Sequence, residues 1–401
     1  MDALSGVYMY VFVPTNILAM WLVVNHLGLA RGLHVGAFFN MMGSALMYGV
    51  GQSFLHSMSW TDYQVKYIGV FCCALGQAFV LPMVALLSGN WFGEEERATA
   101  TSLSTLAIQF GTLLGLGSTM VFDFRDEISE KLDPDKLDQY LQLQFIVSCT
   151  ALGAVLVSLT DDRPPTPPSQ AAATLAKDTA VAVKYLDSVR LVLGSPSSRA
   201  FFCLFGLAVS CFYSIPAFLS QFMPGWPPRH QGMLGAIFQI AAVLGCCAAG
   251  RLVSWFQLRY KTISLLLLGG CLVSVTLYLV SVEYQSYLAM VACAGMGFFF
   301  SSFMSVGIEF GTALTFPADE AAVYGLLDST GEFSGFLLVT LGGSMSHAHM
   351  EVWFCATLVG LIGLAFFMLW RLQPLVRRPS QFTASTSSSI FDDDVRDSLR
   401  L

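Results

Sequence analysis

The stretch DDRPPTPPS, residues Asp161–Ser169, interrupts a chain that is otherwise made of long apolar segments. Proline at this density favours an extended backbone and cannot continue a helix, so the stretch ends the segment before it. Five apolar segments precede it and six follow it. Each has about the ~20 residues that a helix needs to cross the hydrocarbon of a bilayer. The segments are Leu4–Val24, Leu33–Leu55, Tyr67–Gly89, Ala98–Phe122, Leu141–Thr160, Ala200–Phe222, Met233–Phe256, Thr262–Val282, Tyr287–Ala313, Ala322–Ser344 and Val352–Trp370.

The composition also indicates a membrane protein. Of the 401 residues, 55% are hydrophobic and 12% are charged, whereas a soluble domain averages about 25% charged residues. The formal net charge is −7 and no basic stripe exists, which argues against a nucleic-acid partner. We therefore expect an all-α integral membrane protein with two helical bundles and eleven transmembrane helices, five before the hinge and six after it. The lipid bilayer is its expected surrounding, and no protein partner is evident.

The distribution of basic residues predicts the orientation of the chain. Most of the 20 Lys and Arg residues fall on one side of the predicted membrane, and the positive-inside rule makes that side cytoplasmic. The hinge is then inside and Met1 is outside. The expected units are an N-terminal bundle at 1–160, a cytoplasmic Pro-rich hinge at 161–199, a C-terminal bundle at 200–371 and a disordered cytoplasmic tail at 372–401.

A short amphipathic helix is predicted within the hinge. It covers Ala180–Leu193, and its apolar residues Val181, Val183, Leu186 and Val189 share one side. Such a helix is expected to lie on the inner membrane surface.

A short motif recurs at matching places in the two halves of the chain. Gln109-Phe110-Gly111 lies within the fourth apolar segment, and Glu332-Phe333-Ser334 lies within the tenth. Each segment follows a short loop of its own. The first loop begins near Phe92 and the second begins near Phe316. Two-bundle transporters bind their substrate near mid-membrane, between the repeated halves. The repeat therefore predicts a site at the bundle interface.

Ionisable and aromatic residues in the apolar segments point to the same place. Asp328 and Glu332 are four residues apart and so share one helix face. A charge in the bilayer core is costly, so such residues tend to face a pore or a partner. For Asp328, the alternative to facing a pore is a hydrogen bond between helices. Glu309 is a third acid in the apolar segments, and its alternative role is a structural anchor near the inner surface.

Tyr213 stands in CFYSIP, residues 211–216, where Pro216 loosens the helix one turn later. A tyrosine ring beside a carboxylate and an amide suits an ammonium ion, through cation–π and charge attraction. Packing in the core is the alternative for this ring. The predicted substrate-binding residues are Gln109, Tyr213, Asp328 and Glu332, which would contact a small-molecule substrate. A coupling proton on Glu332 is a further expected partner.

Enzymatic activity is not expected. The sequence has no recognisable nucleophile–base pair, metal cluster or phosphate-binding loop, so no catalytic residue, metal or cofactor is predicted.

Several motifs occur in a characteristic order along nearly the whole chain. They are LSGVYM (4–9) with Val13-Pro14, GAFFN (36–40), WFG (91–93) with Glu96, QFG (109–111), RPPTPPSQ (163–170), FYS (212–214) with Gln221, Glu309-Phe310, Phe316-Pro317 with Glu320, and GLL (325–327). In order and spacing they resemble the feline leukaemia virus subgroup C receptor-related transporters of the major facilitator superfamily. The resemblance implies alternating-access transport of choline and ethanolamine across the plasma membrane, or across an organelle membrane. Haem export, attributed to some members, is the alternative.

The resemblance also implies roles for individual residues. The family's choline pocket uses a Trp in the first helix, a Gln in the fifth, a Tyr in the seventh and a Gln in the eleventh. Gln109 and Tyr213 fall at the fifth- and seventh-helix positions, and Glu332 replaces the Gln of the eleventh. The Trp has no counterpart, because the resemblance starts at the second helix. We therefore expect the first helix to be absent, which leaves a non-transporting receptor or a truncated fragment as a further alternative.

The predicted inner gate departs from the superfamily pattern. In the superfamily, the loop between helices two and three usually carries an Asp that pairs across the bundles. Here Asn25 stands in that place, in NHLGLAR (25–31), and Ser254 stands in the matching place of GRLVS (250–254). The predicted gating residues are Asn25, Arg31, Arg97 and Arg251. We expect the gate to rely on hydrogen bonds rather than ion pairs.

Overall fold

The computed structural model describes residues 3–54, 60–93, 96–122, 134–166, 185–219, 222–223, 226, 228–255, 260–284, 286–316, 318–347 and 350–372. The predicted tail after residue 372 lies outside the described residues, as do 180–184, the start of the predicted hinge helix.

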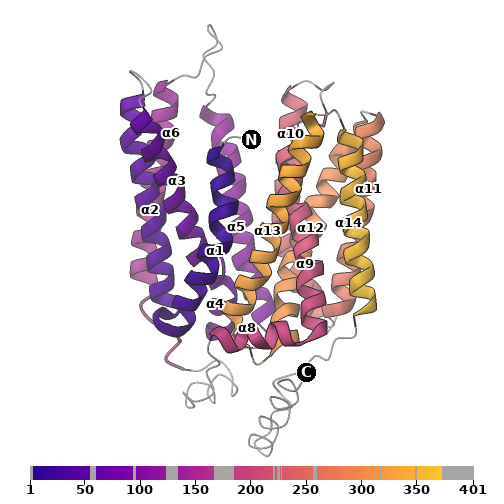
Figure 1. Cartoon of the computed structure of the whole chain (residues 1–401), viewed down its shortest axis with the longest axis horizontal. Helices are drawn as coiled ribbons and strands as arrows, with labels where there is room; N and C mark the ends of the chain where they lie inside the picture. Colours follow the sequence, from indigo (N-terminus) through magenta and orange to yellow (C-terminus); the bar gives the residue numbers. More distant parts are fainter. Residues whose placement is uncertain are drawn as a thin grey trace, which may run out of the picture.

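The helices form two groups, one from each half of the chain (Figure 1). The first group consists of α1 (Ala3–Leu22), α2 (Gly28–Phe54), α3 (Trp60–Val80), α4 (Met83–Trp91), α5 (Arg97–Phe122) and α6 (Pro134–Ser158), with a π-helical turn η1 (Val23–Leu27) between α1 and α2. The second group consists of α9 (Pro196–Phe218), α10 (Pro228–Trp255), α11 (Tyr260–Tyr284), α12 (Leu288–Thr315), α13 (Glu320–His347) and α14 (Glu351–Arg371). The short helix α8 (Tyr185–Gly194) precedes the second group.

Eight segments of the described chain are long and apolar enough to cross a membrane. One of them, Val11–Gly49, covers parts of both α1 and α2, whereas α5 and α13 lie outside the eight. Both of these helices are rich in Ser, Thr and Gly, which lowers their hydropathy. The all-α multi-pass membrane fold is confirmed, and the number of eleven crossings stays a prediction.

The two groups touch at one end and diverge toward the other (Figure 1). Across the interface, α1 packs on α13, and α5 packs on α10 and α12. The groups meet at the end that carries α4 and α8, which we call the inner end, and they are apart at the end where the N-terminus lies. With the hinge on the cytoplasmic side, as the sequence predicts, this arrangement would be outward-facing.

Helix α8 lies at the inner end and contacts helices of both groups. Its buried residues are Tyr185, Ser188 and Val192, which follow helical spacing. Leu186, predicted on the apolar side that faces the membrane, is 58% exposed. The face that contacts the bundles is set by where α13 begins: the Ser188 Oγ accepts a hydrogen bond of 2.9 Å from the Asp319 N–H. That the apolar side with Leu186 lies on the membrane surface stays a prediction.

The turn between α1 and α2 depends on a glycine. Gly28 has a φ of 73°, in the left-handed region, and the carboxylate of Asp162 lies where its Cβ would be. That carboxylate accepts a hydrogen bond of 2.8 Å from the Ala30 N–H. The start of the hinge is therefore fixed to the first turn of α2.

We expect Gly28→Ala to destabilise the protein. The left-handed conformation costs an L-residue about 1–2 kcal/mol, and the added methyl group overlaps the Asp162 carboxylate. The melting temperature of the detergent-solubilised protein measures this effect. Gly153→Ala is the matched control, because nothing lies within 4 Å of its Cβ position on α6. Equal melting temperatures for the two variants would contradict the account of this turn.

Candidate functional site

Two acids are buried together on α13 at the bundle interface. Asp328 is 3% exposed and Glu332 is 7% exposed, one helical turn apart. The Tyr213 hydroxyl on α9 donates a hydrogen bond of 3.2 Å to Oδ1 of Asp328, while Oδ2 of Asp328 is buried without a partner. Among the described residues, no Lys or Arg pairs with either acid; the titratable neighbours are Tyr213 and Tyr324. Unpaired buried carboxylates are costly, so this cluster is expected to meet a cation or a proton.

The position of these acids follows from how α13 begins. Oδ1 of Asp319 accepts hydrogen bonds from the N–H groups of Ala321 (3.0 Å) and Ala322 (3.2 Å), so Asp319 caps the helix. Burial raises the pKa of Asp319, and these two hydrogen bonds offset part of that rise. The cap fixes the start of α13, and with it the face on which Asp328 and Glu332 lie.

A pair of amides joins the two bundles at Gln109, the position on α5 that matches Glu332 on α13. The Gln239 Nε2 on α10 donates to both the backbone oxygen and Oε1 of Gln109, each at 2.8 Å. Gln109 is 5% exposed and Gln239 is 3% exposed. The residues after the repeated polar positions also match, since Phe110 is 50% exposed and Phe333 is 55% exposed. The two helices thus present the repeated motif in the same way, polar residue buried and phenylalanine outward.

Aromatic stacking joins α9 and α10 at the residues next to Tyr213 and Gln239. Phe212, next to Tyr213, stacks on Phe238, next to Gln239, with ring centroids 5.5 Å apart. No hydrogen bond joins Gln109 to Tyr213, Asp328 or Glu332. The structure therefore brings Tyr213 and Asp328 into contact, places Glu332 one turn further along α13, and pairs Gln109 with Gln239 instead.

The inner end of the interface is closed by further contacts between the bundles. Arg97 on α5 forms an ion pair with Glu320, the first residue of α13. One turn along α5, the Thr101 hydroxyl donates to the buried Glu309 carboxylate on α12.

Asn16 on α1 also contacts the other bundle. Its Nδ2 donates to the Gly325 oxygen at 2.7 Å and to the Ser329 hydroxyl at 2.8 Å, both on α13. Asn16 is 1% exposed. These contacts tie α1 to α13 at the level of Asp328, since Ser329 is the residue that follows it.

The predicted gating residues occupy different places. Arg97 takes part in the cross-bundle contacts, as described. Asn25 is half-buried in η1, and Arg31 and Arg251 are exposed. None of these last three makes a hydrogen bond or an ion pair with its side chain in the described part of the chain, so their role in the gate stays a prediction. The expectation of a gate without ion pairs was wrong, because Glu320 supplies a carboxylate from α13.

Several interface residues were not predicted as site or gate residues, among them Asn16, Thr101, Gln239 and Glu320. An amide inside an apolar segment is the signal that identifies Asn16 and Gln239, since such a group must find a partner when buried. Thr101 carries no comparable signal, because threonine commonly bonds to its own helix.

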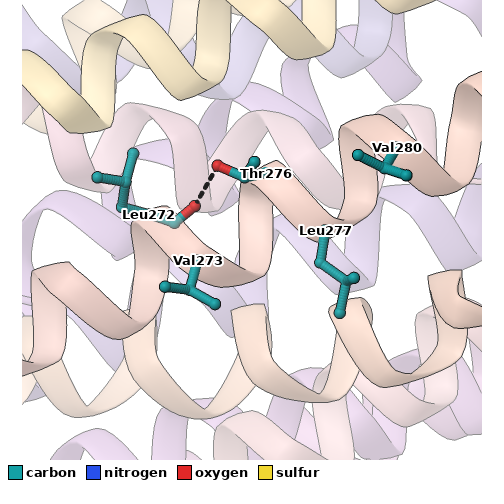
Figure 2. A pocket seen from close by; sticks show the side chains of 5 residues that line it. All are labelled: Leu272, Val273, Thr276, Leu277 and Val280. Carbon is teal, nitrogen blue, oxygen red and sulfur yellow. Dashed lines mark hydrogen bonds between the residues drawn. The ribbon is translucent and has the colours of Figure 1, made fainter.

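A small apolar pocket lies elsewhere, on the surface of α11 (Figure 2). It is lined by Leu272, Val273, Thr276, Leu277 and Val280. The Thr276 hydroxyl is satisfied by the Leu272 oxygen of its own helix, at 2.7 Å. The lining thus offers no free polar group to orient a charged ligand, unlike the interface between the bundles.

Fold and site together define a two-bundle membrane protein with a polar interface. The Major Facilitator Superfamily model matches residues 1–337, so the chain belongs to the Major Facilitator Superfamily. It is a multi-pass membrane transporter and not an enzyme.

Curated relatives confirm the resemblance drawn from the motifs. The choline/ethanolamine transporter flvcr2b of Danio rerio is 23% identical over 377 residues, covering 92% of this chain and 73% of that protein. Solute carrier family 49 member A3 of Xenopus tropicalis is 26% identical over 346 residues, covering 84% and 68%. The choline/ethanolamine transporter FLVCR2 of Homo sapiens is 24% identical over 353 residues, covering 86% and 64%. The chain thus spans between 64% and 73% of the length of these relatives.

Solved structures share the fold. The Escherichia coli fucose:proton symporter superposes with a TM-score of 0.68 at 15% identity, covering 92% of this chain and 91% of that one. The human organic anion transporter MFSD10 gives a TM-score of 0.65 at 16% identity, covering 91% and 83%. At these identities the likeness concerns the fold alone.

Proposed function

We propose that this chain transports a small organic cation such as choline or ethanolamine by alternating access. The observation that carries the proposal is the acid cluster of Asp328 and Glu332, which is buried at the interface without a basic partner in the described chain. A substrate ammonium group would supply the missing positive charge. The relatives named choline/ethanolamine transporters support this substrate class.

Each residue of the cluster has a distinct part in the proposal. The Tyr213 ring provides a cation–π surface, and its hydroxyl holds Asp328 in place. Asp328 and Glu332 provide the countercharge. Two uncompensated carboxylates would repel an anionic substrate, so the cluster favours an organic cation over haem, whose propionates are negative.

A coupling proton would use the same two acids. When the substrate leaves, the buried pair again lacks a positive partner, and one proton would neutralise part of its charge. The fold neighbour from Escherichia coli is named a proton symporter, which gives a precedent for the mechanism on this fold. We therefore propose Asp328 and Glu332 as the proton site as well.

The proposed movement uses two units joined by the hinge. We propose that residues 1–160 and 200–371 rock against each other while 161–199 connects them, and that 372–401 is a cytoplasmic tail. The contacts made by Arg97, Thr101 and Asn16 close the inner end in the outward-facing state. They must separate before substrate is released to the cytoplasm.

Substitution of Tyr213 tests the cation site. Tyr213→Ala removes the cation–π contact, worth about 0.5–2 kcal/mol, and is expected to raise the half-saturating choline concentration by roughly tenfold. Tyr213→Phe keeps the ring and loses one hydrogen bond, so roughly a threefold change is expected. The measurement is uptake of radiolabelled choline by cells that express the protein.

Tyr284→Ala is the matched control, because Tyr284 is 73% exposed on α11. It should transport as the unmodified protein does. Uptake by Tyr213→Ala equal to that of the control would remove Tyr213 from the site.

A further inference from the structure

Two basic residues meet where α11 begins and α14 ends, at the inner end of the second group (Figure 1). The Lys261 Nζ donates to the backbone oxygen of Trp370 at 3.1 Å and to that of Leu372. It thereby caps the last turn of α14, where the helix dipole favours a cation. Lys261 thus reaches the backbone on both sides of Arg371, and we call these two residues the Lys261–Arg371 patch.

The positive charge of this patch is not neutralised by any acid within the described part of the chain. Neither Lys261 nor Arg371 forms an ion pair there. By contrast, Arg190 on α8, at the same end of the molecule, pairs with Asp187. The two carbonyls occupy two of the three N–H donors of the Lys261 ammonium group, which leaves one donor for a ligand.

Aromatic rings orient the guanidinium group of Arg371. Its Cζ lies 5.3 Å from the ring centroid of Phe367 and 6.0 Å from that of Trp370. These contacts use the face of the guanidinium, whereas its N–H donors lie in its plane and make no hydrogen bond with a described residue. That fork matches two oxygens of a phosphate group. Phe367 is 48% exposed and Trp370 is 61% exposed, so the patch is open to a ligand.

The sequence adds three more basic residues to the same place. Arg259 directly precedes α11, and Arg377 and Arg378 follow α14, all three outside the described residues. The stretches 256–262 and 371–380 contain no acid. Clusters of about four to eight Lys and Arg at the inner end of a transmembrane helix attract anionic phospholipids.

We propose that the Lys261–Arg371 patch binds the headgroup of an anionic phospholipid, such as phosphatidylserine. Arg371 holds two phosphate oxygens, and Lys261 gives its remaining N–H to the same headgroup. Trp370 indicates a lipid rather than a soluble phosphate, because exposed tryptophans at helix ends lie at the level of the lipid headgroups. A zwitterionic headgroup brings its own ammonium group and is therefore disfavoured by the patch. This inference does not depend on which substrate the protein transports.

Fluorescence quenching of Trp370 measures which lipid occupies the patch. The purified full chain is reconstituted in brominated phosphatidylcholine, which quenches tryptophan, and unbrominated phosphatidylserine is added to displace it. The difference between the unmodified protein and Trp370→Phe isolates the signal of this ring. We expect phosphatidylserine to bind about five- to 30-fold more tightly than phosphatidylcholine, because each basic residue near a membrane surface changes binding by about fivefold.

Variants of the patch should lower this preference in steps. Arg371→Gln is expected to lower it about fivefold, and Arg371→Gln with Lys261→Gln to remove it. Arg371→Lys retains the charge and should keep most of the preference, so the two single variants carry the test if the double variant does not fold. Arg190→Gln is the matched control, since it removes a positive charge that Asp187 already neutralises, and it should leave the preference unchanged.

Three results would overturn the proposal. The first is equal binding of the two lipids by the unmodified protein. The second is a preference that Arg371→Gln leaves unchanged, or that Arg190→Gln lowers by as much, because either would assign it to the overall charge of the surface. The third is displacement of phosphatidylserine by soluble glycerophosphate, which would show that the patch takes a free phosphate and not a lipid.

Discussion

Replacing both acids of the α13 cluster by their amides, Asp328→Asn with Glu332→Gln, is expected to reduce choline uptake by about 100-fold. The change keeps the size and shape of both side chains and removes the whole countercharge. Interactions with a charged group are worth about 1.5–3 kcal/mol each, and every 1.4 kcal/mol is about tenfold in affinity. Glu332→Gln alone should have a smaller effect, because Asp328 keeps its charge and its hydrogen bond from Tyr213.

The measurement is the initial rate of labelled choline uptake, normalised to the amount of protein at the membrane. Asp187→Asn with Glu283→Gln is the matched control, because both acids are exposed, on α8 and on α11. Uptake by the cluster variant within about threefold of this control, which is less than one charged interaction is worth, would contradict the role of the acids.

Reversing the charge of Arg97 is expected to give the second largest effect. Arg97→Glu places two carboxylates across the inner end, where Arg97 now pairs with Glu320. Repulsion there favours separation of the bundles and lowers the population of the outward-facing state, which is the state that accepts external substrate. We expect uptake to fall roughly tenfold, because a shift of about 1.4 kcal/mol changes a population ratio by that factor.

The swapped variant distinguishes charge pairing from loss of shape. Arg97→Glu with Glu320→Arg restores opposite charges and should recover most of the uptake. The full cycle of single and double variants measures the coupling between the two residues. Uptake in the swapped variant as low as in Arg97→Glu would show that the ion pair itself does not govern the gate.

The sequence predicts the overall architecture well for a physical reason. A helix in lipid must satisfy its own backbone hydrogen bonds and needs about 20 apolar residues, so each crossing leaves a long signal. The interface helices are also recognisable, because the motifs at Gln109 and Glu332 break this apolar pattern at matching positions. Tyr213 and Asp328 could be identified in the same way, and they lie in contact.

The partners of these residues could not be predicted from the sequence. Asn16 bonds to Ser329 across 313 positions of the chain, and Gln239 bonds to Gln109 across 130. Each pairing depends on how the two bundles sit against each other, which leaves no periodic pattern in either segment. The same reason explains the error about the gate: the partner of Arg97 comes from the first turn of α13 and not from the loop after α1.

The central claim is that the interface binds a small organic cation through its charge. Competition against labelled choline uptake, with the purified protein in proteoliposomes, tests it most directly. The competitors are ethanolamine and the uncharged isostere of choline, in which a quaternary carbon replaces the nitrogen. The account predicts saturable uptake that ethanolamine inhibits and the uncharged isostere does not. Equal inhibition by the two competitors, or no saturable uptake, would contradict it.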